Sequence, residues 1–509
     1  MHSETGGLRA LFAAFGTAGL LVALTIAAAL NCRDGGERCD DPPPVLSARV
    51  AASPWQDGDP FPLFSQLVPN LTPSSRVIED ERTGLVVAND VPEPPSVPTL
   101  PTVSLDDAAA HSPAAAAPAL TPLPTRGPMV PTPLVDPAHR GMAPFYTALA
   151  RGTGLARAAQ WGDSTIAADG ITGTVRTRLQ QRFGYGGPGW IAAGLDPQWS
   201  FRPGLDTHRV GEWETKSILL GGGNGRYGFG GVVSTAPDGG YLTVRAPSGP
   251  DGAPRPLQHL ELWLQAGAGH GSWWLSADGA GVGEGSASAD NRDDRRHVVE
   301  LPAGFTKAAF GANGGPVPFY GVVLETSGPG VVWDALGVVG VGTRSFNYFA
   351  DGHLAAQVGQ RAPELVVLML GGNELGIPVL AKGDGMKYAP FYKETLRRLR
   401  AGAPQAGCLV VTPLDQGTRE GGRPQTKPAL SRLVGVQRKI AADEGCAFWD
   451  AFAAMGGEGS VVAWSRTKPP LAWADLLHLS AAGQDLVGQA LADAIEAGFD
   501  DWRTTQGSP

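Results

Sequence analysis

Four short, almost entirely apolar runs, separated by amphipathic helical patterns, constrain the fold of this chain more than any other feature. They are GVVWDALGVVG (330–340), ELVVLMLGG (364–372), CLVVTP (408–413) and CAFWDAF (446–452). Strands covered on both faces lose the alternation of polar and apolar residues and give runs of this kind. Helical patterns lie at 392–402, 428–445 and 481–498. With a fifth run, LARAAQW (155–161), this order predicts a three-layer α/β domain around a parallel five-stranded sheet.

A long block with a different pattern separates the first run from the second. Apolar and polar residues alternate in YLTVRA (241–246), HLELWLQ (259–265), HVVELPA (297–303) and FYGVVLET (319–326). The alternation places Leu260, Leu262 and Leu264 on one face of a strand, as in an antiparallel sheet with one solvated face. The glycine-rich stretch 221–231 lacks the Lys-Ser/Thr pair of a phosphate-binding loop and is expected to form turns. The block predicts an inserted β-sandwich or jelly roll.

Two local patterns flank the run LARAAQW. Before it, Asp136 is expected to cap a helix opened by Pro137, with Phe145 and Leu149 on its apolar face. After it, the turn GDS leads into TVRTRLQQRFG, a helical pattern that stops at Gly184. The sequence therefore predicts a strand, a tight turn and a helix around the GDS motif.

The N-terminal part has the composition of an anchor followed by a tether. Residues 10–31 contain no charge and are long enough to cross a bilayer, so a retained transmembrane helix is expected, with a cleaved signal peptide as the alternative. Residues 32–132 are rich in Pro, Ala and Ser and predict a disordered linker. The large C-terminal part is then expected in the periplasm or at the cell exterior. The expected parts are a short tail with the anchor (1–31), the linker (32–132), the first α/β segment (133–190), the inserted β domain (191–330) and the second α/β segment (331–500).

Charge and cysteine content exclude some classes of site. The formal net charge of -9 argues against a nucleic-acid surface, which needs a clustered basic face. The four cysteines show no zinc-ligand spacing, so no metal site is expected. Cys408 and Cys446 each begin an apolar run. If those runs are neighbouring parallel strands, the two sulfurs can form a disulfide; the sequence leaves both states open.

Polar residues follow the predicted strands where open parallel sheets bind their ligands. Ser164 follows the first strand, Gly340 and Gly342 follow the second, and Asn373 and Glu374 follow the third. Because carboxyl ends of parallel strands meet at one sheet edge, these residues are expected to converge. The simpler alternatives are that Asn373 caps a helix, that Glu374 braces loops and that Gly340 is a packing glycine.

The sequence WADLLHLS near the C-terminus completes the set of groups that acyl transfer needs. A serine hydroxyl becomes a good nucleophile when an imidazole removes its proton, and the imidazole needs a carboxylate to fix its tautomer. Asp475 and His478 are three positions apart, so a turn or short helix can point both the same way. Ser164, His478 and Asp475 are therefore the predicted triad. The predicted oxyanion donors are the amide of Ser164, a glycine amide at Gly340 or Gly342, and the side chain of Asn373.

With these motifs the chain resembles the SGNH (GDSL-like) hydrolase superfamily. Gly162-Asp163-Ser164 is similar to its first block, Gly340 to its second-block glycine, Gly371 to Asn373 to its third block, and Asp475-x-x-His478 to its fifth block. The chain is most similar to extracytoplasmic peptidoglycan O-acetylesterases, which carry a carbohydrate-binding-like β insertion after the first block. In the third block, Gly372 stands where those esterases often have Thr. The resemblance implies a flavodoxin-like sheet and a Ser-His-Asp triad.

The expected function is that of a membrane-anchored serine esterase that removes O-acyl groups, O-acetyl above all, from an extracytoplasmic glycan such as peptidoglycan. No cofactor is expected. An O-acetyltransferase with the same triad is one alternative, and a glycan-binding scaffold with an idle triad is another. The tryptophans of the β block either stack on sugar rings or, as is more usual, form its core: Trp199, Trp213, Trp263, Trp273 and Trp274.

Overall fold

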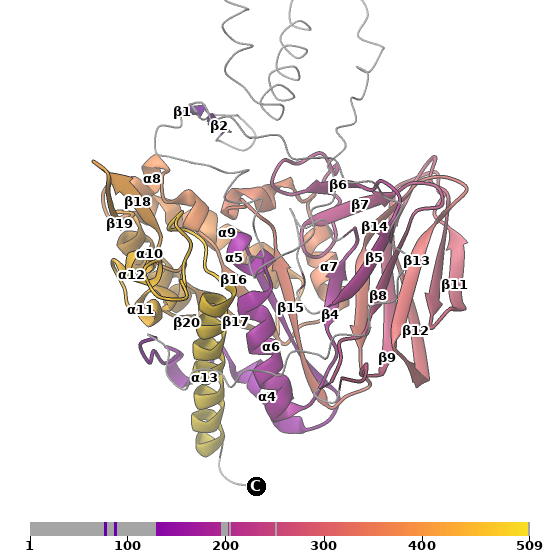
Figure 1. Ribbon diagram of the computed structural model, residues 1–509, viewed down its shortest axis with the longest axis horizontal. Helices are drawn as coiled ribbons and strands as arrows, with labels where there is room; N and C mark the ends of the chain where they lie inside the picture. Colours follow the sequence, from indigo (N-terminus) through magenta and orange to yellow (C-terminus); the bar gives the residue numbers. More distant parts are fainter. Residues whose placement is uncertain are drawn as a thin grey trace, which may run out of the picture. The chain divides into compact units, whose positions relative to one another are not determined.

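The computed structural model describes residues 129–194, 202, 205–249 and 252–506, and two short strands further towards the N-terminus (Figure 1). The strands β1 (Arg76–Ile78) and β2 (Val86–Ala88) pair antiparallel inside the predicted linker, which had included no strands. Their β-branched sequences, RVI and VVA, favour extended backbone over disorder. The predicted anchor (10–31) lies outside the described residues. Among the described residues, no helix is long and apolar enough to cross a membrane.

A parallel five-stranded sheet forms the centre of the α/β domain, as the apolar runs predict. The strand order is β15 (Gly330–Gly337), β3 (Leu155–Gly162), β16 (Leu365–Met369), β17 (Gly407–Val411) and β20 (Ala447–Trp449). Every pairing in this sheet is parallel. Because the β domain enters between β3 and β15, strands that are neighbours in space are separated by more than 160 residues of chain.

Helices cover the sheet on both faces and form two hydrophobic cores. One face packs against α7 (His353–Arg361), α9 (Ala389–Ala401) and α10 (Leu430–Glu444). The other face packs against α4 (Ala143–Arg151), α6 (Gly170–Phe183), α11 (Ala451–Met455) and α13 (Ala481–Thr505). Shorter elements complete the domain: α5 (Ser164–Ala167), α8 (Pro378–Ala381), α12 (Ser460–Trp464) and a hairpin of β18 (Gly417–Glu420) and β19 (Arg423–Thr426).

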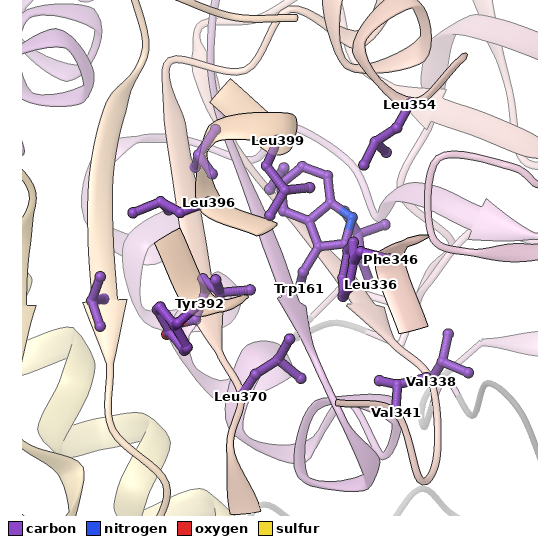
Figure 2. Close-up of a cluster of buried hydrophobic side chains, with 14 of the residues drawn as sticks. Trp161, Leu336, Val338, Val341, Phe346, Leu354, Leu370, Tyr392, Leu396 and Leu399 are labelled. Atoms are coloured by element: carbon purple, nitrogen blue, oxygen red, sulfur yellow. The ribbon is translucent and has the colours of Figure 1, made fainter. Parts of the chain in front are cut away.

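The core on the first face fixes the loops that leave the strands. Figure 2 shows the indole of Trp161, at the end of β3, surrounded by Leu336, Phe346 and Leu399. Val341 and Leu370, which are 1% and 0% exposed, belong to the same cluster. These side chains lie next in sequence to the GDS turn, to Gly340 and to Gly371. Their burial therefore holds three separate loops at one edge of the sheet.

The inserted β domain is an antiparallel two-sheet sandwich. Its six-stranded sheet contains β12 (Asp293–Phe305), β9 (Leu257–Ala266), β14 (Val317–Glu325), β7 (Val232–Ala236), β6 (Glu214–Ser217) and β4 (Gly189–Ala192). Its five-stranded sheet contains β11 (Ala280–Ser286), β10 (Ser272–Ala277), β13 (Lys307–Asn313), β8 (Tyr241–Arg245) and β5 (Asp206–Val210). Leu260, Leu262 and Leu264 lie together in the core between the sheets, as predicted.

The expectation of one solvated face is wrong for the centre of the six-stranded sheet. All residues of β14 are buried. Phe319, Val322 and Leu324 point into the sandwich core, whereas Tyr320 and Val323 belong to the core of the α/β domain. The six-stranded sheet therefore lies between the five-stranded sheet and the α/β domain, and both its faces are covered.

A buried ion network joins the two domains at this contact. The guanidinium of Arg361 on α7 lies 2.6 Å from a carboxylate oxygen of Glu325 on β14 and 2.7 Å from one of Asp334 on β15. Arg157 on β3 approaches Glu325 at 2.8 Å. The side chains of Arg361, Glu325 and Asp334 are at most 2% exposed. Two cations thus balance two carboxylates in the absence of solvent.

The helix predicted to begin at Pro137 begins later, at Ala143. Only a 3₁₀ turn forms at 137–139, because Ala138 and His139 have positive φ values of 57° and 54°, which a right-handed helix cannot include. The carboxylate of Asp136 accepts hydrogen bonds from the amides of Gly141 and Met142 instead. By contrast, α6 ends at Phe183 with Gly184 as its cap, as predicted.

The structure joins Cys408 and Cys446 in a disulfide, with Cα atoms 4.6 Å apart. Cys408 lies in β17, and Cys446 directly precedes β20, which pairs with β17. Of the two states that the sequence left open, the structure has the bridged one.

Candidate active site

The GDS motif forms a tight turn at the carboxyl end of β3. Asp163 is the N-cap of α5, and its carboxylate accepts a hydrogen bond from the amide of Thr165 at 2.9 Å. Burial raises the pKa of Asp163, and the Thr165 bonds and the charge of His478 offset part of this rise. Ser164 is the first residue of α5, where its amide has no partner within the helix. The turn thus presents the hydroxyl and the amide of one residue at the sheet edge.

The structure brings Ser164, His478 and Asp475 together. Ser164 Oγ lies 3.1 Å from His478 Nε2, although 314 residues separate them. His478 Nδ1 lies 2.7 Å from Asp475 Oδ2. With the imidazole 21% exposed and the carboxylate 28% exposed, both groups are reachable from solvent. The geometry is a continuous relay from hydroxyl to imidazole to carboxylate.

The turn at 473–478 orients this relay. The amide of Trp473 donates to the carbonyl of His478 at 2.8 Å and closes the turn. Asp475 Oδ1 accepts hydrogen bonds from the amides of Leu477 and His478. Burial disfavours ionisation of Asp475, but the bond from His478 and these two amides outweigh it, so its pKa is below the ordinary value. Asp475 is therefore held as a carboxylate facing the imidazole.

The second and third motifs contact each other beside Ser164. Asn373 Nδ2 donates a hydrogen bond to the carbonyl of Val341 at 3.0 Å. The amide of Val341 donates to the carbonyl of Val338, and the amide of Gly342 donates to Ser345 Oγ. Gly340, with φ of 80°, lies in the left-handed region that favours glycine. Of the two candidate glycines, Gly342 thus has its amide engaged within its own loop.

Glu374 braces the neighbouring loops, as the simpler prediction for it had it. Its Oε1 accepts hydrogen bonds from the amide and the hydroxyl of Thr343, and its Oε2 accepts from the hydroxyl of Tyr388. Burial raises the pKa of Glu374, and these bonds partly offset the rise. The second and third motifs are therefore cross-linked through one buried carboxyl group.

Gln416 and Lys427 lie close to the site, and the sequence analysis missed both. A Cβ atom on Gly372 would lie 2.3 Å from Gln416 Nε2, so the amide fills the space of an absent side chain. Lys427 Nζ donates to Gln416 Oε1 at 3.1 Å. Burial lowers the pKa of Lys427 to about 8, against the opposing charges of Asp163 and Asp475. The available signal was that Gln416 follows β17 at the same sheet edge as the other motifs.

The inserted domain also reaches the second motif. Methyl carbons of Leu219, in the loop after β6, would lie 3.2 Å from a Cβ atom on Gly340. The next residue, Leu220, is 75% exposed. The insertion therefore packs directly on the loop that carries Gly340 and exposes an apolar side chain beside it.

The tryptophans of the inserted domain divide between core and surface. Trp263 and Trp273 are buried, at 2% and 8% exposure. Trp213 packs against Phe310 and Phe319. Trp274 is half-buried and lies near Tyr241, whereas Trp199 lies outside the described residues. Core packing therefore accounts for three of the five.

Comparison with known proteins agrees with this geometry. Residues 301–486 match the GDSL-like Lipase/Acylhydrolase family, a span that contains Asn373, Asp475 and His478. Ser164 precedes the matched span because the inserted domain interrupts the α/β domain. None of the curated proteins searched matches the chain.

Solved structures share the fold. A structure titled "Peptidoglycan O-acetylesterase in action" is 23% identical and has a TM-score of 0.60, over 72% of this chain and 99% of that one. An acetylxylan esterase from Geobacillus stearothermophilus is 22% identical over 33% of this chain and 73% of its own, with a TM-score of 0.25. A family two carbohydrate esterase from Clostridium thermocellum is 12% identical over 58% of this chain and 100% of its own, also with a TM-score of 0.25. The family match and the shared fold identify the chain as an SGNH hydrolase with a GDSL-like lipase/acylhydrolase domain, a carboxylic-ester hydrolase.

Proposed function

We propose that this protein removes O-acetyl groups from an extracytoplasmic glycan such as peptidoglycan, with Ser164, His478 and Asp475 as its catalytic triad. The observation that carries the proposal is the 3.1 Å approach of Ser164 Oγ to His478 Nε2, together with the 2.7 Å contact of His478 with Asp475. The whole-length likeness to a peptidoglycan O-acetylesterase supports the choice of glycan and acyl group.

In the first half of the reaction Ser164 Oγ attacks the ester carbonyl. His478 Nε2 accepts the hydroxyl proton, and Asp475 stabilises the imidazolium that results. The carbonyl oxygen becomes an oxyanion, for which the Ser164 amide, the Gly340 amide and Asn373 Nδ2 are the proposed donors. The engagement of the Gly342 amide with Ser345 favours Gly340 as the glycine donor. The tetrahedral intermediate then breaks its bond to the sugar oxygen, which takes the proton from His478 and leaves as a free hydroxyl.

In the second half a water molecule replaces the sugar. His478 removes a proton from the water as it attacks the acetyl-serine carbonyl, and the same donors hold the second oxyanion. Collapse of this intermediate releases acetate and returns the proton to Ser164. A sugar hydroxyl in place of water would give acetyl transfer, with the same triad and the same intermediate.

Acetate release from O-acetylated polymers tests the proposed activity. The purified chain is incubated with O-acetylated peptidoglycan, with the same material after mild alkaline removal of O-acetyl groups, and with added sugar acceptor. We expect free acetate from the first polymer alone and no acetylated acceptor. Acetylated acceptor at the expense of acetate would favour the transferase, and absence of both products from every O-acetylated glycan would contradict the proposal.

Replacing the carboxylate of the triad separates its role from that of a structural contact. In Asp475→Asn the side-chain amide can donate to His478 Nδ1 and hold the wrong tautomer, so kcat on 4-nitrophenyl acetate is expected to fall on the order of 10³–10⁴-fold. Asp443→Asn, which breaks a surface pair with Lys393, is the matched control. Equal kcat values for the two variants would exclude Asp475 from the relay.

Replacing Asn373 tests the oxyanion donors. Asn373→Ala removes one donor that is needed in the transition state, so kcat is expected to fall about 10²–10³-fold with little change in KM. Asn347→Ala serves as the control, because Asn347 is exposed and bonds only Arg398 among the described residues. A rise in KM at constant kcat would instead assign Asn373 to ground-state binding.

We also propose that residues 10–31 anchor the chain in a membrane with the hydrolase outside the cytoplasm. Their uncharged sequence supports an anchor. The Cys408–Cys446 disulfide supports an oxidising compartment. Alkaline extraction of membranes should leave the full chain in the pellet and release a chain that lacks residues 1–31; release of both would contradict the anchor.

A further inference from the structure

The five-stranded sheet of the inserted domain carries a solvent-open trough of about 300 Å³ on its outer face. The residues that line it are Asp206, His208, Tyr241, Thr243, Arg245 and Lys307. Strand register explains why they share a face. Asp206 pairs with Arg245, which pairs with Lys307, and His208 pairs with Thr243 two positions further along. Alternate residues of a strand point to the same side.

Two aromatic rings extend one end of the trough. Tyr241 and Trp274 flank Gly311 in the pairing of three adjacent strands, and their ring centroids are 6.1 Å apart. A Cβ atom on Gly311 would lie 2.9 Å from the Trp274 ring, so the glycine lets the rings lie over the backbone. Both rings are half-buried and thus offer apolar surface to solvent. Such rings stack on the apolar face of a pyranose.

The opposite end of the trough is positively charged. Arg245 pairs with Asp206 at 3.0 Å, yet its side chain is 49% exposed, and Lys307 lies beside it on β13. Two cations and one carboxylate leave an excess of one positive charge at physiological pH. Thr243, at the middle of the floor, is small enough to leave space between the charged and aromatic ends.

The trough is separate from the Ser164 site. The reverse face of its sheet, with Leu242, Val244 and Phe310, forms the core of the sandwich. The six-stranded sheet fills the space between that core and the α/β domain, through Trp263 and Tyr320. The trough therefore faces away from the hydrolase.

We propose that this trough is a second, non-catalytic site for a glycan chain that bears carboxylates. Tyr241 and Trp274 stack on a sugar ring, and Arg245 and Lys307 pair with a carboxylate of the same chain. The inference rests on the proposed function in that it takes the bound polymer to be the one that Ser164 deacetylates. Binding there holds the enzyme on an insoluble polymer while successive esters reach the active site.

Co-sedimentation with insoluble peptidoglycan sacculi tests the trough without turnover. The full chain carrying Ser164→Ala is mixed with sacculi stripped of O-acetyl groups, and with cellulose as a neutral polymer. Trp274→Ala and Thr243→Tyr, which removes a ring and fills the floor respectively, should each weaken binding to sacculi about tenfold or more. Lys307→Gln should weaken binding and reduce its dependence on salt. Matched controls are Lys216→Gln and Val298→Ala, an exposed cation and an exposed apolar residue on the other sheet.

Three results would overturn the proposal: sedimentation of Trp274→Ala and Thr243→Tyr equal to that of the parent, no binding of the parent to sacculi, or equal binding of the parent to cellulose. Thermal melting of each variant guards against misfolding, and Lys307→Gln alters only a surface side chain. Acetate release by the chain with Ser164 intact is measured in parallel. It tests the esterase, whereas binding by the Ser164→Ala chain tests the trough, so that either can fail alone.

Discussion

Ser164→Ala should abolish ester hydrolysis and leave the fold intact. The hydroxyl is the only group in the described site placed both at a strand end and within hydrogen-bond reach of the His478 imidazole. Without it no acyl-enzyme can form, so kcat on 4-nitrophenyl acetate is expected to fall about 10⁴-fold or more. Steady-state kinetics and thermal melting on the same preparation measure the two parts of this expectation.

Ser465→Ala is the matched control for this substitution. Its hydroxyl donates to the carbonyl of Val462 and lies outside the proposed site. Hydrolysis by Ser465→Ala should equal that of the parent. If Ser164→Ala retained more than a few per cent of the parent's hydrolysis, the idle-triad scaffold would become the better account, because glycan binding by the inserted domain needs no nucleophile.

Arg361→Met should destabilise the protein more than loss of any surface ion pair. The substitution removes the cation between Glu325 and Asp334 and leaves two buried carboxylates with only Arg157 close to one of them. Breaking a buried pair in this way costs about 3–5 kcal/mol. The free energy of unfolding in urea, followed by tryptophan fluorescence, measures the loss.

Arg397→Met provides the comparison on the surface. Arg397 pairs with Glu444 at 2.9 Å, but its side chain is 62% exposed, so its loss should cost about 0–1 kcal/mol. Equal losses for the two variants would contradict a solvent-free network at the domain junction.

The pH dependence of stability should separate Arg361→Met from the parent. Burial opposes ionisation of Glu325, but Arg361 and Arg157 outweigh it and hold its pKa below the ordinary value. A depressed carboxylate pKa contributes stability that is present above the unfolded pKa, about 4.3, and is lost as pH falls through the folded value. Arg361→Met removes part of this contribution. The difference in unfolding free energy between parent and variant should therefore be largest near neutral pH and should narrow below about pH 4.

The sequence was sufficient for those features that depend on local pattern. Fully apolar runs predicted the strands, and the residues just after them predicted which side chains meet at the sheet edge. The convergence of Ser164 and His478 follows from strand topology, which is why 314 intervening residues did not obscure it.

Features that depend on packing between distant segments could not be read in this way. The alternation in FYGVVLET indicates one solvated face, and only the position of β14 between two cores shows that both are covered. Likewise, the proximity of Gln416 to Gly372 arises because the loop after β17 folds back against the third motif. The break at Ala138 and His139 depends on the capture of two later amides by Asp136, which composition does not reveal.

Trapping the covalent intermediate tests the central claim that a hydroxyl and an imidazole from opposite ends of the chain act as one nucleophile. The protein is mixed rapidly with 4-nitrophenyl acetate, quenched in acid during the first turnover, digested and analysed by mass spectrometry. The added mass of one acetyl group on the peptide that contains Ser164, and its absence after His478→Ala, is the predicted result. An acetyl group carried by another residue, or hydrolysis that proceeds with Ser164 never labelled, would contradict it.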